Sequence, residues 1–193
     1  MTLSRDRVLE LIDERVANDH LRRHMLATEA IMRAVAEKLG HDPAVWGLAG
    51  LSHDLDVELT ANDFARHGRE AAEVLSAAGA PPEVAHAVAA HNEAHTGVRA
   101  ETALDVALIA ADQLSGLITA AALIRPDKSV LGLQLKSLRK RYRETAFARG
   151  VDRSAIARCG DLGFTLDDFL AVGLAAMQEA ATAVGLEGAA PEA

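Results

Sequence analysis

The segment Gly47-Leu48-Ala49-Gly50-Leu51-Ser52-His53-Asp54-Leu55-Asp56 is an apolar, helix-like run that ends in an adjacent histidine and aspartate. A neutral imidazole and a carboxylate are both good ligands for Zn, Mn or Fe. Placing the two together at the edge of a core segment is costly unless a cation or a polar partner uses them. The pair alone is weak evidence, because a second pair occurs at His41-Asp42, inside a turn. Its meaning depends on the other metal-ligand residues along the chain.

The amino-acid composition predicts one all-α domain. The 193 residues are 50% apolar and 25% charged, which is enough apolar material for a sizeable core. Aromatic residues make up only 3% of the chain, and a core of Ala, Leu, Val and Ile favours packed helices over sheets. We expect a single helical domain over residues 1–185, with a metal-binding core at about 18–119 and C-terminal helices at about 129–184. Residues 186–193 are expected to form a flexible tail.

Capping residues and breaks predict the helix positions. We expect helices to begin after the caps Ser4, Asn18, Asp42 and Thr165, the last of them running to about Val184, with a short helix over 61–66 capped by Thr60. Further helices are expected over 67–78, 82–91, 101–124, 129–144, 145–149 and 154–159, and a polar loop over 92–99. The apolar stretch 106–124 is long enough to suggest a membrane span, but its polar residues favour a buried core helix.

The charge balance and the cysteine content limit the classes of partner. A formal net charge of −8 disfavours broad nucleic-acid binding. Cys159 is the only cysteine, so no disulfide can form within the chain, and it is a poor candidate nucleophile. The first residues carry no apolar signal segment. We therefore expect a cytoplasmic protein without a membrane partner; the oligomeric state cannot be read from the sequence.

Two further residues with metal-ligand side chains lie inside predicted helices. His24 lies mid-helix in Arg23-His24-Met25-Leu26, and Asp112 lies in the middle of the apolar run 108–113. An ionised carboxylate at the centre of a buried helix needs a partner, a metal or a shifted pKa. A single histidine such as His24 is by itself more simply interpreted as a core residue. Its occurrence together with the other ligand-type residues predicts a metal site.

The order His24, His53-Asp54 and Asp112 resembles the HD-domain superfamily of metal-dependent phosphohydrolases. The signature of that superfamily is a lone His, a His-Asp pair and a distal Asp, each on a different helix of an all-α fold. His67 and His91 resemble the additional ligands of members with two metals. A helix-capping role for His67 and a helix-dipole role for His91 are the structural alternatives. The resemblance implies a helical bundle of the HD-domain type with a helical C-terminal extension.

The resemblance also implies how the metals would be held. One ion would take His24, His53, Asp54 and Asp112, and the other would take Asp54, His67 and His91. These residue types suit one or two ions of Fe, Mn, Co, Mg, Zn or Ni. Such ions lower the pKa of a bound water, which yields a hydroxide nucleophile, and they stabilise negative charge on a phosphoryl group. The implied function is hydrolysis of a small phosphoester, such as a nucleotide, with Asp54 as a catalytic residue.

One departure from the family pattern follows the His-Asp pair directly. Many two-metal members continue with Ile-Gly-Lys, whereas this chain continues with Leu55-Asp56-Val57, so a phosphate-binding lysine is missing there. Asp56 is a candidate catalytic proton relay, a group that orients a ligand, or a solvated loop acid. Candidate replacement cations for binding the substrate are Arg66 and Arg69, beside His67, and the basic run Lys136, Arg139, Lys140 and Arg143. That run is either a solvated basic face or a phosphate contact.

Two other functions stay open at this point. Some HD-domain proteins with the same ligand set resemble mixed-metal or di-iron oxygenases that cleave a C–C or C–P bond, and a His/Asp di-iron site supports oxygen chemistry. A noncatalytic ligand-binding module is the third hypothesis, which the loss of a metal ligand would favour; none is lost. Among the remaining histidines, His95 is the best candidate for a substrate contact, and His20 lies one turn before His24 on the same helix face.

Overall fold

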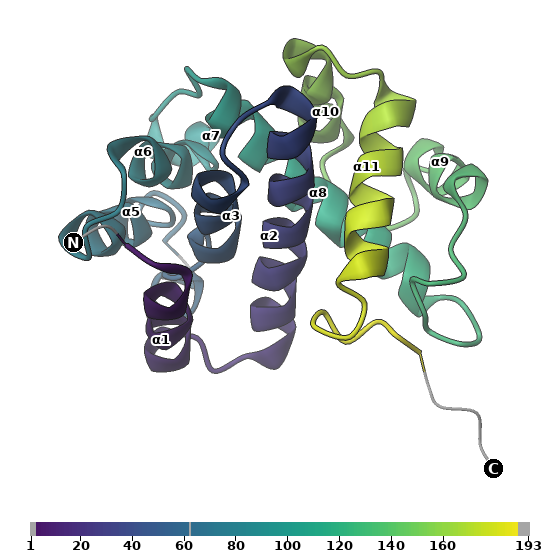
Figure 1. The fold of residues 1–193 in the computed structure, drawn as a ribbon, viewed down its shortest axis with the longest axis horizontal. Coiled ribbons are helices and arrows are strands. Elements are labelled where there is room, and N and C mark those ends of the chain that lie inside the picture. Colours follow the sequence, from purple (N-terminus) through teal and green to yellow (C-terminus); the bar gives the residue numbers. More distant parts are fainter. Residues whose placement is uncertain (1–2, 62, 189–193) are drawn as a thin grey trace.

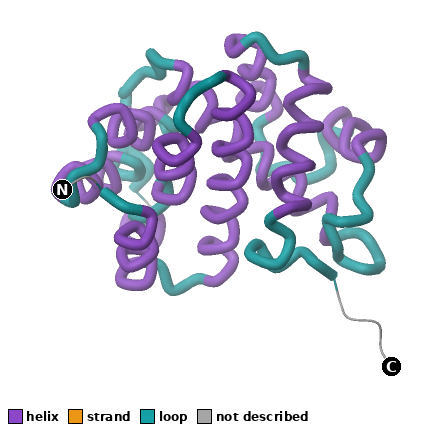
Figure 2. The backbone as a smooth tube through the Cα atoms, in the orientation of Figure 1, coloured by secondary structure: helices purple, strands orange, loops and turns teal. Residues whose placement is uncertain are grey.

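The computed structural model describes residues 3–61 and 63–188 of the chain. These residues form helices and loops without a β-strand (Figure 2), which confirms the all-α prediction. The helices, in chain order, are α1 (Arg5–Arg15), α2 (Asp19–Leu39), α3 (Pro43–Ser52), α4 (Val57–Thr60), α5 (Arg69–Ala77), α6 (Pro82–Ala90), α7 (Glu93–Thr96), α8 (Ala103–Leu123), α9 (Leu135–Arg143), α10 (Arg153–Ala157), the 3₁₀ helix η1 (Arg158–Leu162) and α11 (Leu166–Glu179).

Two 21-residue helices, α2 and α8, form the centre of the molecule (Figure 1). Helix α2 packs against α3, α8 and α11, while α8 also packs against α6, α9 and α10. Leu108, Leu114 and Ile118 of α8 are fully buried. By length and composition α8 could cross a membrane, but 61% of its most apolar window is buried inside the fold. This is the burial expected of the central helix of a core.

Short polar side chains cap the helices at the predicted positions. The side chains of Ser4, Asn18, Asp42 and Thr165 each accept a hydrogen bond from a backbone N–H in the first turn of the following helix. These contacts confirm the predicted starts of α1, α2, α3 and α11, because each cap satisfies an N–H that the helix itself leaves without a partner. The capping box between Thr102 and Asp105 at the start of α8 was not predicted.

Three segments differ from the predicted secondary structure in the first two thirds of the chain. Thr60 ends α4 instead of capping a helix, and its hydroxyl donates to the carbonyl of Asp56 at 2.7 Å. Residue 61 and residues 64–68 form turns. The predicted loop 92–99 contains the short helix α7. Helix α9 begins at Leu135, because the chain before it is held by other contacts: the Ser129 hydroxyl donates to the carbonyl of Glu187.

The C-terminal part also differs from the predicted secondary structure, and contacts between distant segments again account for the differences. Residues 145–149 form turns, where the Arg153 guanidinium donates to several backbone carbonyls, including those of Ala148 and Val151. Helix α11 ends at Glu179 rather than at Val184. Leu186, predicted to begin a flexible tail, is only 4% exposed, and its carbonyl accepts from the Val130 N–H at 2.8 Å. The fold therefore extends past residue 185, and residues 189–193 of the predicted tail lie outside the described residues.

Glycines in the opening segment let α3 approach α2 closely. A Cβ atom built on Gly50 would lie 2.9 Å from the Cα and backbone N of Glu29, so no larger residue fits without movement of the helices. On the same face, a Cβ on Gly47 would lie 2.7 Å from Nε of Arg33. The Glu29 carboxylate next to this seam is buried and pairs with Arg33 at 2.9 Å and with Arg5 at 2.7 Å. The contact between Gly50 and the Glu29 backbone sets how closely the end of α3 approaches the middle of α2.

Candidate metal centre

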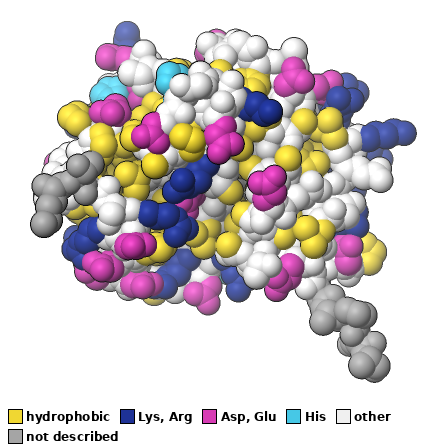
Figure 3. Space-filling model, viewed as in Figure 1, with side chains coloured by type: hydrophobic (Ala, Val, Ile, Leu, Met, Phe, Trp, Pro, Cys, Tyr) yellow, Lys and Arg dark blue, Asp and Glu magenta, His cyan; other side chains and the backbone are white. Residues whose placement is uncertain are grey.

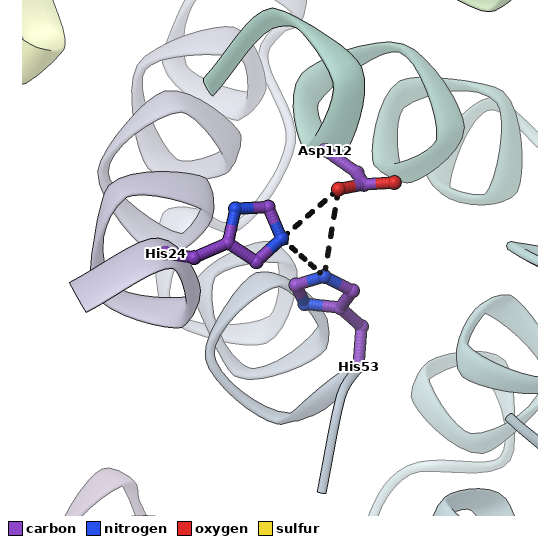
Figure 4. A group of neighbouring side chains, drawn as sticks. All are labelled: His24, His53 and Asp112. Atoms are coloured by element: carbon purple, nitrogen blue, oxygen red, sulfur yellow. Dashed lines mark hydrogen bonds and ion pairs between the residues drawn. The ribbon is translucent and has the colours of Figure 1, made fainter. Parts of the chain in front are cut away.

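Three of the predicted ligands meet where α2, α3 and α8 come together (Figure 4). His24 extends from α2, His53 follows the last residue of α3, and Asp112 lies in the middle of α8. The Nε2 atom of His24 lies 3.0 Å from Oδ1 of Asp112 and 3.2 Å from Nε2 of His53. The His53 Nε2 atom lies 3.8 Å from the same Asp112 oxygen. The three side chains thus point one ligand atom each at a common centre.

The other predicted ligands form a second group beside the first. Asp54, His67 and His91 each offer an atom to a shared centre. The Nε2 atoms of the two histidines are 3.1 Å apart. Oδ1 of Asp54 lies 3.5 Å from Nε2 of His67 and 3.6 Å from Nε2 of His91. His67 comes from the turn before α5 and His91 from the end of α6, so this group depends on a different pair of helices.

Asp54 connects the two groups. Its second oxygen, Oδ2, lies 3.5 Å from Nε2 of His53 and 3.6 Å from Nε2 of His24. Each oxygen of one carboxylate therefore faces a different group, and all six predicted ligands form one cluster. A carboxylate in this position can bridge two cations.

Backbone carbonyls fix the tautomer of two of the histidines, that is, which ring nitrogen carries the proton in the neutral ring. The Nδ1 atom of His53 lies 2.9 Å from the carbonyl oxygen of Gly50, and Nδ1 of His91 lies 2.5 Å from that of Val88. A carbonyl oxygen only accepts hydrogen bonds, so each Nδ1 carries the proton. In the neutral ring, Nε2 is then an unprotonated lone pair.

Side chains fix the other two histidines in the same way. Nδ1 of His67 donates to Oδ1 of Asp56 at 2.8 Å. Nδ1 of His24 lies 3.0 Å from the Ser115 hydroxyl, which donates its own proton to the carbonyl of Asp112 and so accepts from the ring. Such hydrogen bonds to the remote nitrogen are typical of metal-ligating histidines, because they hold the ring and direct its free nitrogen.

When the imidazoles are neutral, the cluster therefore consists of lone pairs and carboxylate oxygens without protons to share. In their neutral forms the four imidazoles direct unprotonated Nε2 atoms toward one another and toward two carboxylates. Groups of this kind repel each other unless a positive charge lies between them. Nitrogen and oxygen donors in this number fit one or two first-row divalent ions. The residues present thus fit the metal that the sequence predicts.

The pKa values of the buried groups follow the same electrostatics. Burial lowers the pKa of His53, but the carboxylates of Asp54 and Asp112 outweigh it and raise the value to about 9. His53 is therefore protonated at neutral pH until a metal ion binds in place of that proton. Burial alone raises the pKa of the Asp54 carboxyl, yet His53 and the other nearby histidines bring it well below its ordinary value. The pKa of Asp112 is lowered likewise by His24 and His53. Both carboxylates are therefore ionised at neutral pH and attract a cation.

The contacts of Asp56 favour the predicted alternative in which it orients a ligand, while a role as a catalytic proton relay stays an untested prediction. Its side chain is 2% exposed, and one oxygen accepts from His67. The other oxygen accepts from the N–H groups of Gly68, at 2.8 Å, and Ala71, at 2.9 Å. A carboxylate with both oxygens engaged at the start of α5 has no free face for substrate. It positions His67 by fixing both the ring and the backbone around it.

The Asp56→Asn variant is expected to bind metal about 10- to 100-fold more weakly at the group that contains His67, because an amide offers one acceptor where the carboxylate offers two. Titration with Mn²⁺, followed by calorimetry, measures the affinity. Glu58→Gln is the matched control, since Glu58 lies two residues after Asp56, in α4, but accepts from the N–H groups of Ala17 and Asn18. Equal Mn²⁺ affinity in wild type and Asp56→Asn would show that Asp56 does not position a ligand.

Among the described residues, no ion pair or side-chain hydrogen bond joins the predicted substrate-binding cations to the cluster, and their role in substrate binding stays a prediction. The Arg66 guanidinium pairs with Glu70, and that of Arg69 donates to the Thr96 carbonyl. The basic residues of α9, namely Lys136, Arg139, Lys140 and Arg143, lie on a helix at the far side of α11 from α3 (Figure 1). Arg139 there pairs with Asp167 of α11 at 2.6 Å. None of the six lines either of the two cavities described next.

Two cavities border the cluster. The larger, of about 530 Å³, includes His91 and Asp112 together with residues of α7 and α10, and among its walls are His95 and Arg158. The smaller, of about 280 Å³, includes His24 and runs between α2, α8 and the chain at 184–186. The predicted substrate contact His95 thus lies on a cavity wall, and its role in binding stays a prediction.

Sequence reasoning missed several residues around the cluster. Ser115 is polar in a buried stretch and lies three residues after Asp112, a spacing that places both on one helix face. That spacing would have indicated that Ser115 lies near the metal ligands. Arg23 and Arg158 carried no such signal, because their positions depend on how distant segments pack. Cys159 is buried, and burial raises the pKa of its thiol, which agrees with the expectation that it is not a nucleophile.

Comparison with known proteins adds to this geometry. The family model described as HD domain matches residues 21–117, about half of the chain, and that range contains all six cluster residues. Ribonuclease Y from Opitutus terrae is 33% identical over 98 residues, which cover 51% of this chain and 18% of the ribonuclease. The chain thus spans less than a fifth of that relative's length. No solved structure matches. HD domains bind divalent metals, and this chain belongs to the HD domain family.

Proposed function

We propose that this protein hydrolyses a small phosphoester with one or two divalent metal ions held by the cluster. The observation that carries the proposal is the fixed direction of the four imidazoles, each of which has its Nδ1 proton engaged and its Nε2 atom turned inward. Two ionised carboxylates complete the set. Side chains arranged in this way before any ion arrives form a preorganised metal site.

The chain's own residues have distinct parts in this proposal. Divalent ions in such a site lower the pKa of water and offset the negative charge of a phosphoryl group. Asp54 would contribute one oxygen to each half of the cluster, and Asp112 would complete the half at α8. Asp56 and Ser115 hold the rings of His67 and His24 in place. The carbonyls at the ends of α3 and α6 do the same for the other two rings.

The surface and the cavities support a small substrate rather than a nucleic acid. The chain has a net charge of −8, and on the face shown in Figure 3 acidic and basic side chains are intermixed without one continuous basic surface. Nucleic-acid binding relies on clustered Lys and Arg side chains that neutralise phosphates. Cavities of about 280 and 530 Å³ match small ligands in size.

Elemental analysis combined with a phosphate-release assay tests the proposal. Protein purified without chelator is expected to contain one or two equivalents of a divalent first-row metal and to release phosphate from members of a phosphomonoester and nucleotide panel. Chelation should abolish release and lower the melting temperature, because a ligand bound only to the folded state stabilises it. Absence of both metal and phosphate release would contradict the proposal. Bound iron with oxygen uptake, and without phosphate release, would favour the oxygenase instead.

A further inference from the structure

The smaller cavity is continuous with the metal residues through His24. From there it follows the seam between α2 and α8, past Ala120 and Leu123 of α8, to the chain segment around Val184 and Leu186. Its walls on α8 and on the C-terminal segment are thus largely apolar. The segment at 184–186 lies outside the residues that match the family model. This wall is therefore a feature of the C-terminal extension of this chain.

The two cavities differ in charge. Among the described residues, the smaller cavity is lined by Arg23 and two histidines and by no carboxylate. The larger cavity is lined by Glu93, Asp112 and Asp152, and its arginine, Arg158, already pairs with Glu93 at 2.8 Å. A phosphate group is repelled by carboxylates and attracted to a free guanidinium. The anionic part of a substrate is therefore favoured in the smaller cavity.

The position of the Arg23 guanidinium suits phosphate binding. Gly185 has a φ of +67°, and a Cβ atom built on it would lie 2.7 Å from Nη1 of Arg23, so the guanidinium rests directly against the glycine backbone. Within residues 3–61 and 63–188, no carboxylate forms an ion pair with Arg23, in contrast to Arg158. A guanidinium held in this way offers planar, paired N–H donors, which match the oxygens of a phosphate.

We propose that Arg23 binds the phosphate of the substrate and that Leu123, Val184 and Leu186 receive a compact apolar substituent. The substrate class is then a phosphomonoester of a small apolar alcohol, with its phosphate between the guanidinium and the ligands around His24. A cavity volume of about 280 Å³ limits the substituent to a few carbon atoms. This inference rests on the proposed phosphoester hydrolysis and assigns the cation that replaces the missing family lysine.

Calorimetric titration of the Mn²⁺-loaded protein with methylphosphonate and butylphosphonate tests the proposal, because their C–P bonds resist hydrolysis. Wild type should bind butylphosphonate more tightly, by roughly fourfold for each buried methylene. Arg23→Met should weaken the binding of both compounds roughly ten- to hundredfold, with unchanged Mn²⁺ content. Arg23→Lys should recover part of the loss. Leu123→Asn, at an exposed position, should reduce only the preference for the butyl group.

Arg158→Met is the matched control, since it removes the arginine of the larger cavity. It should leave phosphonate affinity unchanged. Weaker binding in Arg158→Met together with wild-type affinity in Arg23→Met would overturn the proposal. Phosphate release with wild-type kcat/KM in Arg23→Met would overturn it as well, while the proposed hydrolysis would stand. Conversely, phosphonate binding that depends on Arg23 in a protein without hydrolytic activity would support the anion site and refute the proposed function.

Discussion

The Asp54→Ala variant is expected to lose phosphate release on the order of a thousandfold or more, while its helical circular dichroism spectrum stays that of the wild type. The physical reason is that this one carboxylate faces both halves of the cluster, with Oδ2 toward His24 and His53 and Oδ1 toward His67 and His91. Its removal takes a ligand from each half at once. The fold should survive, because in the described residues the Asp54 side chain contacts histidines of the cluster and accepts no backbone hydrogen bond.

The chain contains a natural control for this experiment in its other His-Asp pair. Asp42 caps α3 by accepting from the Ala44 N–H at 2.8 Å. Asp42→Ala should therefore cost about 1 kcal/mol of stability, as helix caps do, and leave phosphate release unchanged. Elemental analysis of both variants separates loss of metal from loss of folding. Full phosphate release by Asp54→Ala would refute the bridging role, and so would a loss of activity in Asp42→Ala that equals it.

The Gly50→Ala variant is expected to lower the free energy of unfolding by about 1–3 kcal/mol or more and to weaken metal binding at the same time. A Cβ atom at this position would lie 2.9 Å from the backbone of Glu29, and backbone atoms in a packed helix cannot move aside as a flexible side chain can. Helices α2 and α3 must therefore separate. The Nε2 atoms of His24 and His53 lie 3.2 Å apart across that seam, so these two ligand atoms would separate with the helices.

Chemical denaturation and Mn²⁺ titration measure the two effects of Gly50→Ala. Gly160→Ala is the control, because a Cβ atom on Gly160 would meet no atom within 4 Å. Its free energy of unfolding should stay within about 0.5 kcal/mol of wild type, as for most surface substitutions. If Gly50→Ala were as stable as Gly160→Ala and bound Mn²⁺ equally well, close packing at the seam would not be what positions the ligands.

The identities of the six cluster residues and most helix starts could be predicted from the sequence, because they depend on local chemistry. A cap such as Asn18 accepts hydrogen bonds from N–H groups two and three residues away, so the helix start can be predicted from neighbouring residues. His24, His53 and Asp112 could be recognised for a related reason. Ligand-type side chains in apolar helices are costly without a partner, and their order along the chain resembles that of a known family.

Other features of the site depend on contacts between distant segments, and only the tertiary structure shows them. Asp56 meets a histidine 11 residues away, and Ser115 meets one 91 residues away, through turns and helix packing that no local spacing encodes. The basic run of α9 has a regular helical face, but packing against α8 and α11 places that helix on the far side of α11 from α3.

The C-terminal segment also has a role that depends on tertiary packing rather than on local sequence. Leu186 follows the last helix without any pattern of its own, yet burial against the core makes it a wall of the cavity beside Arg23. The amino-acid sequence alone establishes which side chains can bind a metal. The close packing of α3 against α2 at Gly50 sets the positions of those side chains, and the turn at Gly185 brings the C-terminal segment beside them. Both effects depend on surfaces that come together only in the folded molecule.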